Sequence, residues 1–73
     1  MPGAMLLHDA IETVLREAGR PMHAKDIAAE INRRELYARK DGQPLPANQV
    51  QARVAKPQYR DAFGVRDGII SLV

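Results

Sequence analysis

A chain of 73 residues makes one domain with room for one small core, and an elaborate active-site cleft is not expected at this size. The sequence contains no cysteine, which excludes a disulfide framework, a thiolate zinc site and a thiol nucleophile. The net charge of +2 is unevenly distributed. Residues 1–36 hold five basic and six acidic side chains, net −1, whereas residues 37–73 hold six basic and three acidic ones, net +3. The C-terminal half is therefore the electropositive half.

The N-terminal sequence carries no recognisable targeting signal. No apolar run approaches the roughly 20 residues that span a bilayer, and the opening MPGAMLLHDA lacks both a basic leader and an apolar stretch of signal length. We therefore expect a cytoplasmic protein with no membrane partner. Two methionines surround a Pro-Gly pair at the start, so we assign residues 1–5 to a disordered or cloning-derived N-terminus and residues 6–73 to the folded domain.

Two amphipathic helices are predicted in the first half of the chain. Apolar residues recur there at three- and four-residue spacing, on either side of a Gly-Arg-Pro sequence at residues 19–21 that ends the first helix. The first helix is expected from Leu6 to about Ala18. After a short extended piece at Met22-His23, the second is expected from about Ala24 to Arg34, with charges that complement the helix dipole at both ends.

A loop and a third helix follow. Residues 37–47 contain Asp41-Gly42 and two prolines in a polar setting, which is typical of a restrained loop. A shorter helix is expected from Asn48 to Lys56, with Ala47, Val50 and Val54 on its apolar side. Pro57 prevents the helix from continuing.

The last residues change to a two-residue period. Asp67-Gly68 favours the two-residue turn of a hairpin, which would place Val65 opposite Ile70 and Phe63 opposite Leu72, all on one face of the ribbon. The predicted fold is therefore mainly α with a small β-hairpin. Three helices and a C-terminal wing in this order are the plan of a winged helix-turn-helix domain.

Particular residues also carry a family resemblance. Residues 17–23 read EAGRPMH, Leu36-Tyr37 follows the second helix, residues 51–54 read QARV, and Gly68 precedes the last strand. With these features the chain resembles the HARE-type helix-turn-helix family from Leu7 to Leu72. It departs from the family at Glu35, where a helix-ending glycine is frequent, and at Ile70, where an aromatic residue is common.

The resemblance implies a DNA-binding winged-helix module. Such modules occur alone, fused to bacterial nucleases, in Asx-like chromatin proteins, and in the delta subunit of bacterial RNA polymerase, where the module serves a protein partner. The motif histidine of the family matches His23, for which the resemblance implies a structural role in capping the second helix or bonding the backbone.

The third helix is the predicted reading element, because in winged helices this helix usually enters the major groove. A helical projection turns the residues opposite Val50 and Val54 outward and places Gln51 and Arg53 on the flanks. Amides can pair with adenine edges, arginine with guanine or phosphate, and alanine permits close approach. A merely solvated surface is the alternative, and Arg53 could instead pack over the core. The predicted contact residues of this segment are Asn48, Gln49, Gln51, Ala52, Arg53 and Lys56.

Four further basic residues are candidate phosphate contacts. Arg39 and Lys40 belong to the loop, Arg60 precedes the wing, and Arg66 lies at its tip. Solvated surface charge is the alternative for each of them. Tyr37 and Tyr59 could stack on bases, but their spacing lacks the aromatic platform of single-strand binders.

Neither histidine has the carboxylate or hydroxyl companions of a catalytic site, and paired acidic metal ligands are absent from the sequence. We therefore expect no catalytic residue, no metal site, no cofactor and no small-molecule substrate. The expected partner is duplex DNA, and the expected role is a nucleoid-associated specificity or targeting domain of a larger protein such as a nuclease. The alternative is a protein-interaction module whose partner is RNA polymerase or a fused nuclease domain.

Overall fold

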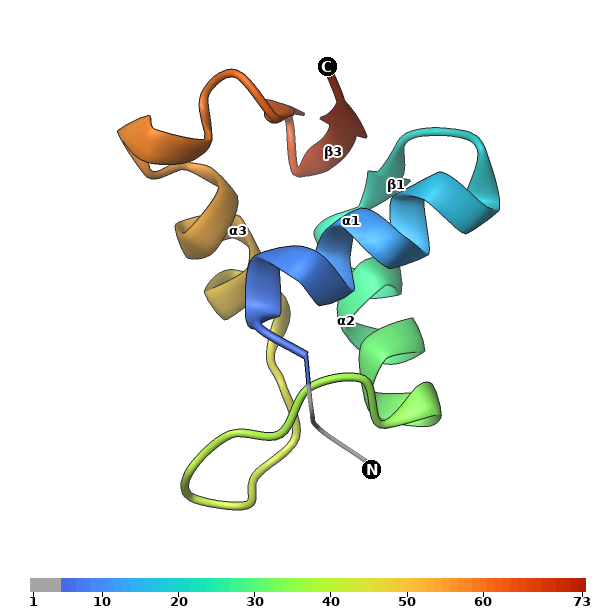
Figure 1. The fold of residues 1–73 in the computed structure, drawn as a ribbon, viewed down its shortest axis with the longest axis vertical. Helices are drawn as coiled ribbons and strands as arrows, with labels where there is room; N and C mark the ends of the chain where they lie inside the picture. The colour runs from blue at the N-terminus through green and yellow to red at the C-terminus, as the bar shows by residue number, and fades with distance from the viewer. Residues whose placement is uncertain (1–4) are drawn as a thin grey trace.

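The computed structural model describes residues 5–73, and most of the segment assigned above to a disordered or cloning-derived N-terminus lies outside the described residues. The chain forms three helices and a small antiparallel sheet (Figure 1). Its elements in chain order are α1 (Leu7–Ala18), β1 (Met22–His23), α2 (Ala24–Arg34), α3 (Ala47–Val54), the 3₁₀ helix η1 (Pro57–Tyr59), β2 (Phe63–Arg66) and β3 (Ile69–Leu72). The predicted winged helix-turn-helix architecture is confirmed.

The first two helices have the predicted bounds to within a residue, and each ends in a left-handed residue. Gly19 ends α1 at a φ of 69°, and its amide donates to the Leu15 carbonyl. Glu35 ends α2 at a φ of 52°. The family resemblance leads one to expect glycine at that position, and the backbone keeps the glycine conformation although a non-glycine residue costs roughly 1–2 kcal/mol there.

The core lies where the three helices and the inner face of the sheet meet. Its fully buried side chains include Ile11 of α1, Ile27 and Ile31 of α2, Val50 of α3 and Ile70 of β3. In Figure 1, α1 crosses the middle of the view, α3 lies to its left and the strands lie above it. The side of α3 turned away from the core is not covered by another element of the described chain.

The loop between α2 and α3 is anchored by a side chain of α2. Asn32 donates from Nδ2 to the Leu45 carbonyl at 3.0 Å, and its Oδ1 accepts from the Leu45 amide at 2.9 Å. The Leu45 side chain is 3% exposed, a burial that the loop composition did not predict. Because the paired bonds lie just before α3, they fix where α3 begins.

The predicted hairpin register is confirmed. Val65 pairs with Ile70 and Phe63 with Leu72, and the turn residues Asp67 and Gly68 have φ angles of 53° and 80°, as the hairpin turn of type I′ requires. Of the four side chains on that face, Phe63 and Ile70 are buried, whereas Val65 and Leu72 are exposed beyond the edge of the core.

Two features differ from the sequence-based expectation. The short extended piece Met22–His23 pairs with β3, so the sheet has three strands in the order β1-β3-β2. The third helix ends at Val54, not at Lys56, and a 3₁₀ helix follows over Pro57–Tyr59. The residue before a proline disfavours helical geometry, and Lys56 is accordingly extended, with φ −65° and ψ 141°.

His23 joins the wing to α2. Its Nδ1 accepts a hydrogen bond from the Lys25 amide at 3.0 Å and so caps α2, while the neighbouring Ala24 amide donates to the Gly68 carbonyl at 2.9 Å. A Cβ placed on Gly68 would lie 2.8 Å from His23 Nε2. The imidazole therefore occupies the space that a side chain at the turn would need.

We predict that His23→Ala lowers the free energy of unfolding by about 1 kcal/mol through the lost cap, which lowers the Tm by about 4–8 °C in a domain of this size. Gly68→Ala should cost more, because it adds both a steric contact and a side chain at positive φ. In the His23→Ala background the steric part should disappear. Thermal unfolding of the four chains checks this, and equal costs of Gly68→Ala in both backgrounds would contradict the contact.

Candidate nucleic-acid interface

The open face of α3 carries polar and small side chains. Val50 and Val54 are buried against the rest of the core, whereas Asn48 and Ala52 are exposed. The predicted orientation of these four residues is confirmed. In Figure 1 this helix borders the left side of the molecule, where no other described element covers it.

The other predicted contact residues of this segment are less simply placed. Gln49, Gln51 and Arg53 are half-buried, so Gln49 does not stand as freely outward as the helical projection suggested. Lys56 is exposed, but it lies beyond α3 at the N-terminal cap of η1. The candidate surface therefore continues past the helix into the turn that follows it.

The loop before α3 lies next to Gln49. A hollow of about 320 Å³ is lined by Gln49 together with Tyr37, Arg39, Lys40 and Asp41 of the loop. Within it, Arg39 Nη2 lies 2.7 Å from Asp41 Oδ2. Lys40 is exposed and forms no ion pair within residues 5–73. The structure thus brings both loop cations to the start of the candidate reading helix.

The two wing cations occupy exposed positions. Arg60 follows η1 directly, and Arg66 ends β2 opposite Ile69 of β3. Both side chains are exposed. Asp67 lies beside Arg66 as a turn residue with positive φ.

Ion pairing separates the two halves of the chain. In α1 and α2, three arginines are neutralised by glutamates, with Arg16–Glu12, Arg33–Glu30 and Arg34–Glu17 at 3.1, 2.8 and 3.1 Å. Hydrogen bonding to Arg33 lowers the pKa of the Glu30 carboxyl below its usual value. In the second half the single ion pair among the described residues is Arg39–Asp41. Within residues 37–73, the cations that lack a carboxylate partner are Lys40, Arg53, Lys56, Arg60 and Arg66.

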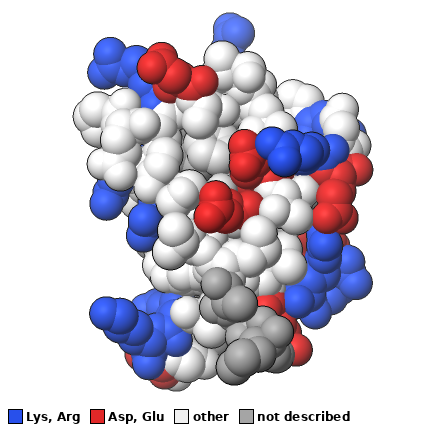
Figure 2. Space-filling view, in the orientation of Figure 1, with Lys and Arg blue, Asp and Glu red and all other residues white. Residues whose placement is uncertain are grey.

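The distribution is visible on the surface. Figure 2 shows acidic side chains in the centre and on the right, over α1 and α2, interleaved with basic ones. The left edge, beside α3 and the loop before it, is mostly basic. Unpaired positive charge is therefore concentrated on the side of the molecule that carries the open face of α3.

Sequence reasoning missed a partner of Arg53. Tyr59 lies partly buried nearby, and hydrogen bonding to Arg53 is the largest influence that lowers the pKa of its phenol. A hydrogen bond with Gln58 and the charge of Lys56 lower that pKa further, while burial opposes the shift. The Tyr59 hydroxyl also lies 3.1 Å from His8 Nδ1. The 3₁₀ helix that positions Tyr59 was not predicted, so nothing in the linear sequence placed these residues together.

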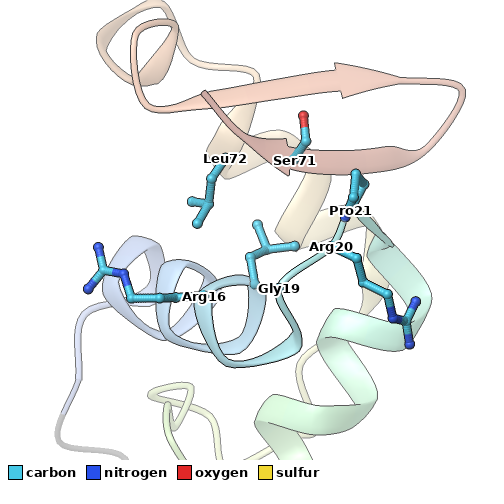
Figure 3. A pocket seen from close by; sticks show the side chains of 7 residues that line it. Arg16, Gly19, Arg20, Pro21, Ser71 and Leu72 are labelled. Carbon is cyan, nitrogen blue, oxygen red and sulfur yellow. The ribbon is translucent and has the colours of Figure 1, made fainter.

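A second hollow lies at the opposite end of the fold and lacks the features of an active site. It has a volume of about 330 Å³ and lies between the end of α1 and β3. Leu72 points toward it, and Arg16 and Arg20 stand at opposite ends with their guanidinium groups turned away (Figure 3). No carboxylate of the described residues lines it. Over residues 5–73 there is also no group of three or more His, Cys, Asp or Glu side chains that could hold a metal ion.

A known protein family shares this architecture and much of this sequence. Its model, HARE-HTH, describes the helix-turn-helix domain of ASXL proteins and restriction endonucleases, and it matches residues 5–63. The chain belongs to this family. Helix-turn-helix domains bind DNA through their recognition helix, and the match includes α3 and η1.

The match ends at Phe63, where β2 begins, although the resemblance noted in the sequence runs on to Leu72. The wing of this HARE-HTH domain is therefore defined by its geometry. Neither a comparison with curated proteins nor one with solved structures gives a match. No helix in the described part of the chain is both long enough and apolar enough to cross a membrane.

The two faces of the α3 segment should respond differently to truncation. Val54→Ala removes two buried methyl groups and should lower the free energy of unfolding by about 2 kcal/mol. Asn48→Ala and Lys56→Ala remove exposed groups and should change it by no more than about 0.5 kcal/mol. Urea unfolding of the three variants measures this. A large loss of stability in Lys56→Ala would show that the side chain supports the fold.

Proposed function

We propose that this HARE-HTH domain is a duplex DNA-binding module in which α3 enters the major groove. The observation that carries the proposal is the concentration of unpaired cations beside the open face of α3, while the arginines of α1 and α2 are neutralised by glutamates. A field of this kind attracts the phosphate backbone. The HARE-HTH match supplies the second support.

Base contacts are assigned to the polar residues of α3. Asn48, Gln49 and Gln51 offer amides for adenine edges, and Arg53 offers a guanidinium for guanine. Ala52 has no long side chain, and its exposure lets the helix backbone approach the duplex closely. The half-buried positions of Gln49, Gln51 and Arg53 favour contacts at the rim of the groove over contacts at its centre.

Phosphate contacts are assigned to the surrounding cations. Lys56 and Arg60 follow the helix, Arg66 extends from the wing, and Lys40 stands on the loop. Arg39 is the weaker member, because Asp41 already accepts its hydrogen bond at 2.7 Å. Surface ion pairs are worth little, so a phosphate can compete with Asp41 for Arg39.

The biological role we propose is that of a specificity or targeting domain in a larger protein such as a bacterial nuclease. No residue of this domain is assigned to catalysis, and DNA cleavage would belong to a fused or associated domain. Cytoplasmic location in association with the nucleoid follows from this role. The alternative of a docking module for RNA polymerase would use the acidic face of α1 and α2, but Glu12, Glu17 and Glu30 are already paired with arginines.

Binding to a labelled duplex should weaken steeply with salt. Each phosphate that the protein neutralises contributes about 0.9 to the slope of log affinity against log salt. Fluorescence anisotropy at low and physiological salt measures the slope. A flat response would contradict DNA as the partner, and capture of RNA polymerase in the absence of duplex binding would favour the alternative.

Variants should distinguish phosphate contacts from base contacts. Lys56→Ala should weaken binding to all duplexes alike and reduce the salt slope by about 1, whereas Gln49→Ala should relax base preference by about 1–3 kcal/mol. The matched control is Arg16→Ala, because Arg16 is paired with Glu12 on α1. If Arg16→Ala weakens binding as much as Lys56→Ala does, the surface has been assigned to the wrong side of the molecule.

A further inference from the structure

An aromatic cluster joins α1 to the segment that follows α3. The Tyr59 and His8 rings have centroids 5.0 Å apart at a tilt of 32°, in addition to their 3.1 Å hydrogen bond. Tyr59 also meets the buried Phe63 edge-on, with centroids 6.4 Å apart. Contacts on two sides therefore hold the Tyr59 ring in place, although the residue remains partly exposed.

The backbone aligns Tyr59 with two of the unpaired cations. The Lys56 amide donates to the Arg53 carbonyl at 3.4 Å, and the Tyr59 amide donates to the Lys56 carbonyl at 2.9 Å. Residues three apart are eclipsed in turns of the 3₁₀ type. Arg53, Lys56 and Tyr59 consequently follow one side of the chain as it leaves α3. The lowered pKa of the Tyr59 phenol agrees with this placement, since Arg53 and Lys56 both contribute to it.

The hydrogen bond between Tyr59 and His8 has a direction that protonation reverses. His8 Nε2 lies 3.5 Å from Asp9 Oδ1, which favours a proton on Nε2 and leaves Nδ1 to accept from the Tyr59 hydroxyl. When His8 takes up a second proton, Nδ1 becomes a donor and the Tyr59 oxygen must accept. The hydroxyl hydrogen is then free to point elsewhere.

The charged groups around this pair are few. Asp9 faces His8 from its own helix, and Glu12, one turn further along α1, is paired with Arg16. On the other side, Arg53 and Lys56 flank Tyr59. A phosphate oxygen accepts hydrogen bonds and carries negative charge, so it complements the donors of this cluster and not the Asp9 carboxylate.

We propose that Arg53, Lys56 and Tyr59 form a binding site for one backbone phosphate of the duplex, and that protonation of His8 strengthens it by releasing the Tyr59 hydroxyl as a donor. This inference rests on the proposed DNA-binding function and adds Tyr59 and His8 to it. Since protonation favours the bound form, duplex affinity should rise as pH falls through the range in which histidine changes charge.

The first test removes the hydroxyl alone. Tyr59→Phe keeps the ring contacts with His8 and Phe63, and it should weaken duplex binding about three- to ten-fold, as expected for one lost hydrogen bond. The matched control is Tyr37→Phe, which alters the other tyrosine of the chain and should leave affinity unchanged. Thermal unfolding verifies that both variants are folded. Equal affinities of Tyr59→Phe and the wild type would overturn the site.

The second test follows the proton. At constant ionic strength, the wild-type domain should bind duplex about three-fold or more tightly near pH 5.5 than near pH 8, in the range where histidine takes up its proton. His8→Gln should abolish this gain, whereas His23→Gln should retain it. A gain that persists in His8→Gln would overturn the role of His8. If the wild type binds no duplex at any pH, the proposed function fails and this site fails with it.

Discussion

The second helix holds both parts of the candidate interface in place. At its N-terminus, the His23 cap and the bond from the Ala24 amide to the Gly68 carbonyl fix the wing. Near its C-terminus, the paired hydrogen bonds between Asn32 and Leu45 fix the loop that leads into α3. The bonds at each end join one side chain or amide to backbone, which sets direction as well as distance. The orientation of α3 relative to the wing therefore depends on α2.

Charge pairing gives this scaffold a polarity that net charge alone conceals. Exposed ion pairs such as Arg16–Glu12 contribute little to stability, but they remove positive charge from α1 and α2. The same total charge with a different pairing would give a surface without a preferred side. Since long-range attraction to DNA depends on the local field, the pairing pattern favours an interface on α3, η1 and the wing.

Hydrophobic periodicity and turn chemistry predicted most of the fold. The bounds of α2, the hairpin register around Asp67-Gly68 and the capping role of His23 all depend on local patterns that the sequence displays directly. The 3₁₀ helix, the burial of Leu45 and the contact between His8 and Tyr59 depend on residues far apart in the chain, and no local period reports them. For the same reason the outward residues of α3 were predictable, whereas the partners of Arg39 and Arg53 were not.

The central claim is that duplex DNA contacts the side of the molecule formed by α3, η1 and the wing. Titration of the isotopically labelled domain with a short duplex, followed by amide chemical shifts in NMR spectra, tests this residue by residue. The account predicts that shift changes concentrate between Asn48 and Arg60 and around Arg66, while the exposed amides of α1 near Arg16 stay unchanged. Changes confined to α1 and α2 would contradict it.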